Sequence, residues 1–144
     1  MLNEIEPMNQ EYKNLWVKAL RSKKYEQGIG HLHNSESGKD KFCCLGVLCE
    51  VGGIKKEENH VYIIDSSYGE VKGIEYIYDG NATCLSEALK QKFGLSENAV
   101  NLLISANDGD LNNDEIKEMK FRRNKDGGYN QSFHVIANWI EKHL

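Results

Sequence analysis

Residues 20–50 read LRSKKYEQGIGHLHNSESGKDKFCCLGVLCE and decide how the rest of the chain is interpreted. The stretch begins on the last turn of a predicted amphipathic helix, continues through a basic segment with two glycines, and ends in an apolar run that holds three of the four cysteines. Its first half combines backbone-permissive glycines, cationic side chains and a tyrosine, which suits a phosphate-bearing ligand. Because no complete catalytic motif is present, the sequence indicates a class of ligand more clearly than a reaction.

The residues before the basic segment predict an amphipathic helix that begins near Asn9 and ends near Arg21 or Ser22. The apolar residues that recur at three-and-four spacing are Tyr12, Leu15, Trp16, Ala19 and Leu20. Trp16 lies in this apolar stripe, so it is interpreted as a core residue rather than as a platform for stacking a base.

The apolar run after the basic segment predicts a second helix. Residues 42–51, FCCLGVLCEV, are followed by Gly52 and Gly53, which favours a buried helix with a glycine C-cap over a strand. Gly46 within this helix would allow another backbone or a ligand to approach closely.

Between these two helices the sequence predicts a short strand and a loop. Ile29 and Leu32 alternate with His31 and His33, which is typical of a strand. Residues 34–40, NSESGKD, are polar throughout and are predicted to form a loop.

The second half of the chain predicts one β-hairpin and further helices. Residues 61–64 and 74–78 are rich in β-branched and aromatic side chains, and the intervening SSYGEVKG is typical of a hairpin loop. Helices are expected at residues 85–93, 97–104, 114–123 and 133–144, with N-caps at Ser86, Ser96 and Ser132. The stretch NDGDLNND, which begins at Asn107, is predicted as a turn-rich acidic loop. The fold class is therefore α+β, a compact single domain over residues 1–144 with about four to five helices and a small antiparallel β-hairpin or sheet.

The composition is that of an ordinary globular protein. Of the 144 residues 40% are hydrophobic and 28% charged, and the net charge of −4 argues against general DNA or RNA binding, which requires a basic surface. No apolar run approaches the roughly 18 residues of a membrane helix, and MLNEIEPMNQ lacks a signal pattern, so a cytosolic protein without membrane contact is expected. The four cysteines are expected to be buried free thiols.

Metal and thiol chemistry are weak interpretations of this sequence. Side chains of the types that ligate zinc occur at His31, His33, Cys43, Cys44 and Cys49. Their spacing does not match paired zinc knuckles, and adjacent cysteines on a helix point about 100° apart. A nucleophilic Cys43 or Cys44 with His31 or His134 stays open, although an apolar setting would raise the thiol pKa.

A calcium loop is the other metal pattern. Asp108, Asp110, Asn112 and Asp114 occupy alternate positions of such a loop, but its usual glycine and its bidentate glutamate are replaced by Asn113 and Met119. A solvated turn is the better interpretation, and no metal or other cofactor is expected.

A binding site therefore remains as the functional interpretation. The cations, tyrosine and glycine amides of the basic segment could hold phosphates and stack a base, and an Asn–Asp pair could read a base edge or a ribose hydroxyl. The alternative interpretation of the basic segment is structural: its cations would lie at the C-terminus of a helix, where they interact favourably with the helix dipole, and a turn would follow. The expected ligand-binding residues are Arg21, Lys24, Tyr25, Gln27, Gly28, Gly30, Asn107 and Asp108.

Two motifs carry a resemblance to a known family. The pattern W-V-x-A-L-R-S-x-K-Y-x-Q-G-x-G-x-L at residues 16–32, followed by F-C-C-L-G-V-L-C-E at residues 42–50, resembles a widespread family of small phage-encoded proteins. The C-terminal part is similar to that family in Leu103, Asn107, Asp108, Gly128, Ser132, Phe133, Ile136, Ala137, Ile140, Glu141 and Leu144. Residues 54–84 show little similarity to the phage family.

The phage family is associated with anti-CBASS nucleotide sponges, which bind the cyclic dinucleotide signals of bacterial immunity without cleaving them. The resemblance implies a non-enzymatic protein that binds a 3′3′-cGAMP-like ligand, forms a homo-oligomer such as a tetramer, and acts in the cytoplasm of the infected host. A nucleotide-degrading enzyme with a His31 or Asp108 base and a module that binds a host protein are the alternatives. Lys23 replaces a glycine expected from the family, and His31 and His33 replace arginines, which changes the local charge.

Overall fold

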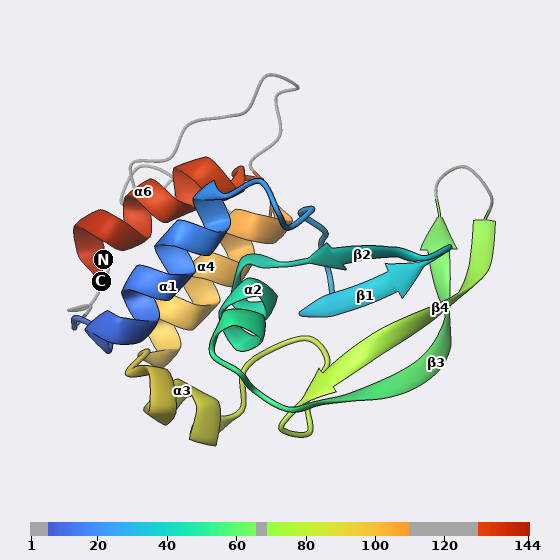
Figure 1. Cartoon of the computed structure of the whole chain (residues 1–144), viewed down its shortest axis with the longest axis horizontal. Coiled ribbons are helices and arrows are strands. Elements are labelled where there is room, and N and C mark those ends of the chain that lie inside the picture. Colours follow the sequence, from blue (N-terminus) through green and yellow to red (C-terminus); the bar gives the residue numbers. More distant parts are fainter. Residues whose placement is uncertain (1–5, 66–68, 110–129) are drawn as a thin grey trace.

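The computed structural model describes residues 6–65, 69–109 and 130–144 and has the α+β architecture predicted from the sequence. The described elements are α1 (Gln10–Arg21), β1 (His33–Glu36), β2 (Lys39–Phe42), α2 (Cys44–Val51), β3 (Lys56–Asp65), β4 (Gly69–Tyr78), α3 (Glu87–Phe93), α4 (Glu97–Asp108) and α6 (Phe133–His143). Figure 1 shows most helices gathered at one end and the sheet at the other, with α2 between them.

Polar side chains cap the helices where the sequence predicts. The Asn9 side chain accepts hydrogen bonds from two backbone amides at the start of α1. Ser86, Ser96 and Ser132 each accept one amide N–H at the starts of α3, α4 and α6. These local signals explain why the helical half of the fold is predictable from sequence.

Helix α4 is longer than predicted. It continues through Asn107 and Asp108 and ends at Gly109, whose φ is +90°. The prediction that these two residues lie in an acidic loop is therefore wrong, because the buried Asn107 side chain is held by tertiary hydrogen bonds that outweigh its weak helix propensity.

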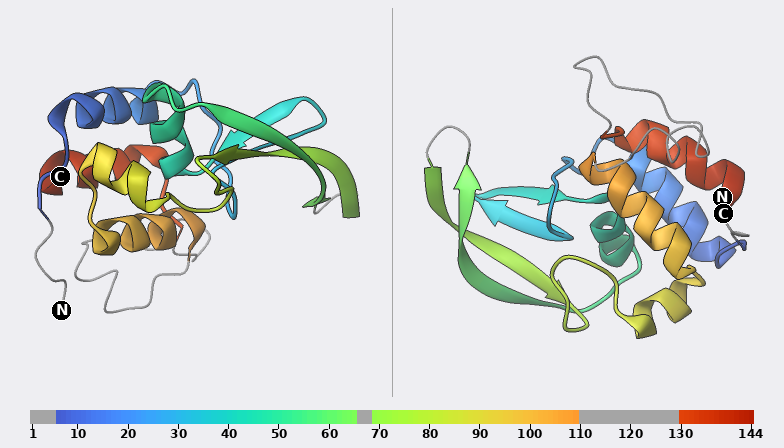
Figure 2. Two further views of the ribbon diagram at one scale, coloured as in Figure 1. Left: turned by 90° about the horizontal axis from the view of Figure 1, so that it is seen from below. Right: turned by 180° about the vertical axis from the view of Figure 1, so that it is seen from behind.

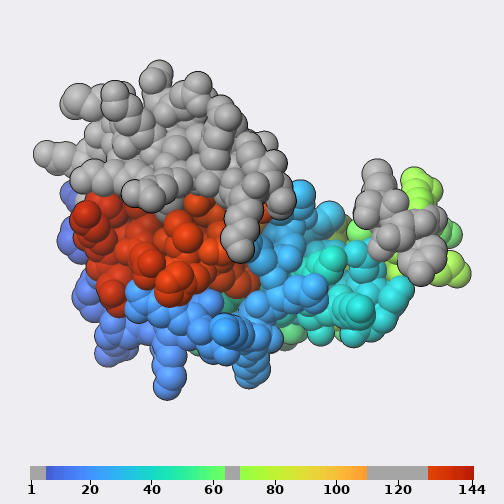
Figure 3. All heavy atoms as spheres, turned by 90° about the horizontal axis from the view of Figure 1, so that it is seen from above, coloured from blue at the N-terminus to red at the C-terminus, as the bar shows by residue number. Residues whose placement is uncertain are grey.

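The core forms where α2 packs against α1 and the chain before β1. Trp16 is fully buried and its Nε1 donates to the Cys44 carbonyl at 2.7 Å, which confirms its interpretation as a core residue. A Cβ atom at Gly46 would lie 1.6 Å from the Leu32 carbonyl oxygen, so only glycine lets α2 approach this backbone. In the space-filling view (Figure 3), α6 in red lies beside the blue segments of the N-terminal part, consistent with the packing of α1 on α6.

The four cysteines are free, and three are buried as predicted: Cys43, Cys44 and Cys49. Cys84, which is also predicted to be buried, is only partly buried. Burial raises the pKa of Cys43 to about 12 and raises the pKa of Cys44 and of Cys49 well above the ordinary thiol value. Thiols in this state are poor nucleophiles, and their place is in the core.

The sheet is antiparallel with strand order β2-β1-β4-β3, and the hairpin of β1 and β2 is not predicted from the sequence. The predicted loop at residues 34–40 is wrong, since β1 and β2 are joined by a two-residue turn at Ser37 (φ +52°) and Gly38 (φ +76°). Two positive φ values are typical of a type I′ turn, whose twist matches the strands. The strand predicted from the alternation of residues 29–33 is also wrong, because β1 begins only at His33.

The predicted hairpin of β3 and β4 is confirmed, and both strands are longer than predicted. Their ladder runs from the pair Lys56 and Tyr78 to the pair Asp65 and Gly69. Figure 2 shows this hairpin reaching away from the helices. A Cβ atom at Gly73 would lie 2.3 Å from Ile63 Cδ1, so the glycine makes room for the Ile63 side chain across the sheet face.

Two predictions fall outside the described residues. They are the helix at residues 114–123 and the calcium-like positions Asp110, Asn112, Asn113, Asp114 and Met119.

Candidate functional site

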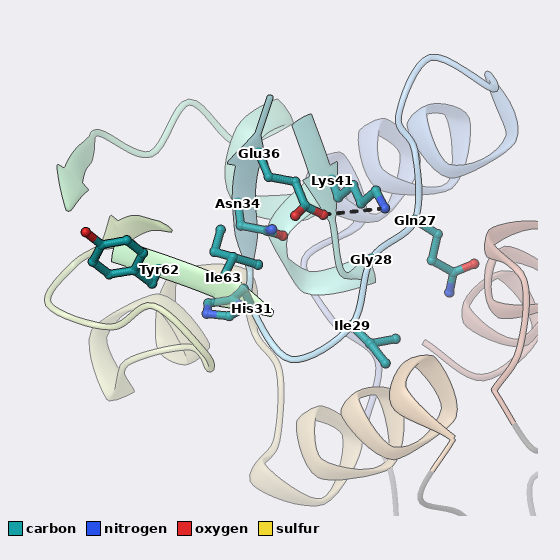
Figure 4. A pocket seen from close by; sticks show the side chains of 9 residues that line it. All are labelled: Gln27, Gly28, Ile29, His31, Asn34, Glu36, Lys41, Tyr62 and Ile63. Carbon is teal, nitrogen blue, oxygen red and sulfur yellow. Dashed lines mark ion pairs between the residues drawn. The ribbon is translucent and has the colours of Figure 1, made fainter. Parts of the chain in front are cut away.

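A cavity of about 510 Å³ lies where β1, β2 and β3 meet the segment before β1; we call it the sheet cavity (Figure 4). Its lining residues are Gln27, Gly28, Ile29, His31, Asn34, Glu36, Lys41, Tyr62 and Ile63. Small-molecule sites typically measure about 300–1,000 Å³ and combine apolar walls with a few polar groups. The sheet cavity has both properties.

Sheet pairing places three polar side chains of the cavity together. Asn34 and Glu36 are two residues apart on β1 and so point to the same face, and Asn34 pairs with Lys41 of β2. Lys41 Nζ lies 3.9 Å from Glu36 Oε1, as the dashed line in Figure 4 marks. The other carboxylate oxygen, Glu36 Oε2, is buried and has no hydrogen-bond partner in the described part of the chain.

Apolar side chains and a histidine complete the lining. Ile29 is 61% exposed, whereas Ile63 is buried against the sheet. His31 Nε2 lies 3.4 Å from Glu75 Oε2, on the neighbouring strand β4. In Figure 4 the Tyr62 ring points away from the polar group and Ile63 lies beside that group, so the apolar surface nearest to it comes from Ile63.

Four of the eight predicted ligand-binding residues come together as internal structure. Asn107 Oδ1 accepts from Gln27 Nε2 at 2.9 Å and from the Cys44 amide at 3.1 Å. Asn107 Nδ2 donates to the Gly28 carbonyl and to Asp108 Oδ1, both at 2.9 Å. The fully buried Asn107 amide thus forms all four of its hydrogen bonds inside the protein and has none left for a base edge.

The glycines of the basic segment have different roles. The Gly28 amide donates to the Phe42 carbonyl at 2.8 Å, so the prediction of a free amide there is wrong. A Cβ atom at Gly28 would lie 2.8 Å from Lys41 Cβ, which explains why glycine is needed beside the end of β2. Gly30 has φ +82° and open space around it, and it turns the chain past the cavity.

Arg21 lies in a different place from the sheet cavity. Its guanidinium donates to Glu141 Oε2 and to Asn138 Oδ1, each at 2.8 Å, and so joins α1 to α6. The hydrogen bonds from Arg21 lower the pKa of Glu141. Arg21 lines a separate groove of about 620 Å³, whose cations include Lys13 and Lys18.

Lys24 and Tyr25 do not line the sheet cavity; Tyr25 packs against a core aromatic ring, and Lys24 lies near Tyr25. The Tyr25 ring packs edge-on against Phe42, with 5.1 Å between ring centroids, and Lys24 Nζ lies 5.6 Å from the Tyr25 centroid. Lys23, which replaces the glycine expected from the resemblance, has φ +63°. This left-handed backbone explains why glycine suits that position.

The cavity residues Asn34, Glu36 and Lys41 are not among the predicted site residues. The available signal was the Ser-Gly dipeptide at residues 37–38, a turn former between two stretches of equal length. A hairpin across this turn pairs residue 34 with residue 41 and places Glu36 on the same face. Because the flanking residues are polar, the usual apolar alternation of a strand is missing.

His33 is enclosed between two aromatic rings. It is 2% exposed, with the Phe42 and Tyr76 rings stacked on its two faces at 3.9 Å. Its Nε2 lies 2.8 Å from Asp40 Oδ1 and its Nδ1 lies 3.0 Å from the Tyr78 hydroxyl. Both ring nitrogens are therefore engaged.

The Tyr78 hydroxyl extends this network to α2. It donates to Glu50 Oε2 at 3.0 Å, and Lys56 of β3 donates to the same carboxylate. Burial lowers the pKa of His33, an effect that the hydrogen bond to Asp40 partly offsets. No group of three His, Cys, Asp or Glu side chains within residues 6–65, 69–109 and 130–144 could hold a metal ion.

A family model described as a domain of unknown function, DUF8296, matches residues 8–144. The chain belongs to this family. The match includes both the helical end and the sheet with its cavity. No curated protein and no solved structure matches the chain. None of the helices that the structure describes is long and apolar enough to cross a membrane.

Proposed function

We propose that this DUF8296 protein binds and sequesters a 3′3′-cGAMP-like cyclic dinucleotide without cleaving it. The observation that supports this most is the sheet cavity, in which a carboxylate, an amide and an ammonium group lie beside apolar side chains. A nucleotide presents a planar ring with hydrogen-bonding edges, and sites for such ligands combine those features. The resemblance to phage nucleotide sponges supports the choice of ligand.

Sequestration without turnover suits the chemistry of this chain. The buried thiols are poor nucleophiles, and the His33 ring is enclosed by aromatic side chains. A sponge needs affinity alone, so a site with binding groups and without an activated nucleophile supports it. One observation favours a nucleotide-degrading enzyme instead, since His31 lines the cavity 3.4 Å from Glu75.

The proposal includes a homo-oligomer, such as a tetramer, in the cytoplasm of an infected bacterium. A cyclic dinucleotide that placed one base in the sheet cavity would extend past Ile29, which is 61% exposed. A second copy of the chain could then contact the other half of the ligand. Symmetric oligomers commonly build sites from short segments in this way.

Native mass spectrometry with 3′3′-cGAMP tests the proposal. The expected result is an oligomer that gains ligand in stoichiometric amount, and intact ligand after denaturation and chromatography. Product that accumulates beyond one turnover would establish the enzyme instead. No retained nucleotide, together with capture of a host protein from lysate, would favour the host-binding alternative.

A matched pair of variants locates the site. Lys41→Gln removes the cavity cation and is expected to weaken binding about tenfold or more. Lys39→Gln removes an exposed cation from the same strand and should leave binding unchanged. Equal affinity of both variants would place the ligand outside the sheet cavity.

A further inference from the structure

One oxygen of the Glu36 carboxylate, Oε2, is buried without a hydrogen-bond donor in the described residues. The Glu36 side chain is 13% exposed, and its other oxygen, Oε1, is 3.9 Å from Lys41 Nζ. A carboxylate only accepts hydrogen bonds, and a buried acceptor without a donor is unfavourable. A ligand that donates hydrogen bonds would remove this deficit.

The neighbours of Glu36 restrict what the donor can be. Asn34 is 6% exposed, lies on the same sheet face and lines the same cavity. The Lys41 ammonium beside the carboxylate supplies donors for an acceptor atom. Ile29 and Ile63 offer apolar contact for a flat ring. The complementary ligand edge therefore has donors next to an acceptor on a planar, partly apolar body.

We propose that the sheet cavity recognises a guanine base, with Glu36 accepting from N1–H and the 2-amino group and Lys41 donating to O6. Guanine carries two adjacent donors beside an acceptor oxygen on one edge. Adenine and cytosine instead place a ring acceptor next to their amino group, which would face the carboxylate unfavourably. A simple amine or guanidinium ligand would satisfy Glu36 but would meet the like charge of Lys41.

This inference rests on the proposed function, because it names the base that the sequestered nucleotide must carry. It also makes separate predictions for the base and for the cyclic backbone. The two proposals can therefore fail independently.

Isothermal titration calorimetry of the full chain tests the inference with a panel of ligands. The panel contains 3′3′-cGAMP, cyclic di-GMP, cyclic di-AMP and cyclic di-IMP, together with GMP and AMP. We expect the guanine-containing cyclic ligands to bind at least about tenfold more tightly than cyclic di-AMP. Cyclic di-IMP, which keeps N1–H and O6 but lacks the 2-amino group, should bind less tightly than cyclic di-GMP.

Two variants separate base recognition from general effects. Glu36→Gln keeps the side-chain size, so the fold should persist, but it replaces one acceptor oxygen with an amide donor. The variant should bind guanine ligands about tenfold more weakly and bind cyclic di-AMP at least as tightly as the parent chain does, because the amide can donate to the ring acceptor of adenine. Glu57→Gln changes an exposed carboxylate on the same sheet and should alter nothing. The inosine comparison needs no variant and holds even if Glu36→Gln is unstable.

The outcomes distinguish the two proposals. Equal affinity for cyclic di-AMP and cyclic di-GMP would overturn guanine recognition and leave sequestration standing. Binding of GMP over AMP without binding of any cyclic dinucleotide would support guanine recognition and overturn the sponge. Binding of cyclic di-AMP alone would overturn guanine recognition only, and no binding of any ligand in the panel would overturn both.

Discussion

Asn107 connects three parts of the molecule through one buried side chain. It joins the end of α4 to the Gly28 segment and to the first amide of α2, at Cys44. An aspartate at this position would keep the shape but lose both N–H donors. We expect Asn107→Asp to lower the free energy of unfolding by about 3 kcal/mol. The Gly28 carbonyl and Asp108 Oδ1, which now accept hydrogen bonds from Asn107 Nδ2, would then face a carboxylate oxygen that cannot donate.

Urea denaturation of Asn107→Asp measures this change. Asn101→Asp alters an exposed residue of the same helix and should stay within about 0.5 kcal/mol of the parent chain. If both variants were equally stable, Asn107 would not hold these segments together.

Lys23 has a left-handed backbone conformation at the position where the phage family has glycine. Its φ of +63° costs a residue with a Cβ atom about 1–2 kcal/mol, whereas glycine adopts this backbone freely. We expect Lys23→Gly to raise the free energy of unfolding by up to about 1 kcal/mol, after the greater freedom of glycine in the unfolded chain is subtracted. Lys24→Gly, at the next position and without a positive φ, should lower it. Chemical denaturation of both variants checks the opposite signs.

At the scale of elements, the sheet is attached to α2 by the network around His33. The groups that face the ring or continue its hydrogen bonds are Asp40 of β2, Tyr76 and Tyr78 of β4, Glu50 of α2 and Lys56 of β3. Because burial lowers the pKa of His33, the folded chain favours the neutral ring. Below about pH 6.5 an unfolded histidine binds a proton that the folded one resists.

The sign of the pH dependence follows from this difference. The contribution of His33 to stability should be full above about pH 6.5 and should decrease as the pH falls toward the lower folded pKa. We expect the difference in unfolding free energy between the parent chain and His33→Gln to shrink between about pH 7.5 and 5.5. Thermal or urea unfolding at each pH measures it. A difference that grows on acidification would mean that Asp40 raises the His33 pKa more than burial lowers it.

The elements also differ in how well the sequence predicts them. Helices α3, α4 and α6 begin at serines whose hydroxyls cap the next turn, a signal contained within four residues. Strands β1 and β2 have the sequences HNSE and KDKF, in which only Phe42 is apolar, so neither shows an apolar alternation. Their pairing depends on the Ser37-Gly38 turn and on contact with the long neighbouring strand β4. Because neither contact leaves a hydrophobic pattern in the sequence, residues 34–40 are predicted as a loop.

At the scale of the whole molecule, the basic segment singled out in the sequence borders the sheet cavity, whereas the polar side chains Asn34, Glu36 and Lys41 of that cavity come from the two strands that follow it. Gln27 and Gly28 do border the sheet cavity, yet Figure 4 shows the Gln27 side chain pointing away from the polar group. Glu36 and Lys41 meet through the register of β1 and β2, and the Ile63 side chain occupies space that a Cβ atom at Gly73, on the neighbouring strand, would fill. Such contacts depend on tertiary pairing, which no local motif records.

Ligand binding should stabilise the whole fold, because the sheet cavity joins β1, β2 and β3 to the segment that follows α1. A ligand that binds only the folded chain adds about 2.7 kcal/mol of stability at a free concentration one hundred times its Kd. For a domain of this size we expect 3′3′-cGAMP at that excess to raise Tm by roughly 5–10 °C.

The same measurement with variants tests whether the stabilisation arises in the sheet cavity. At one fixed ligand concentration, Lys41→Gln should lose most of the increase in Tm, since weaker binding reduces the added free energy. Arg21→Ala changes the α1–α6 contact, and should lower Tm without ligand but retain the increase on adding ligand. If instead Arg21→Ala abolished the increase and Lys41→Gln retained it, the ligand would bind in the groove along α1.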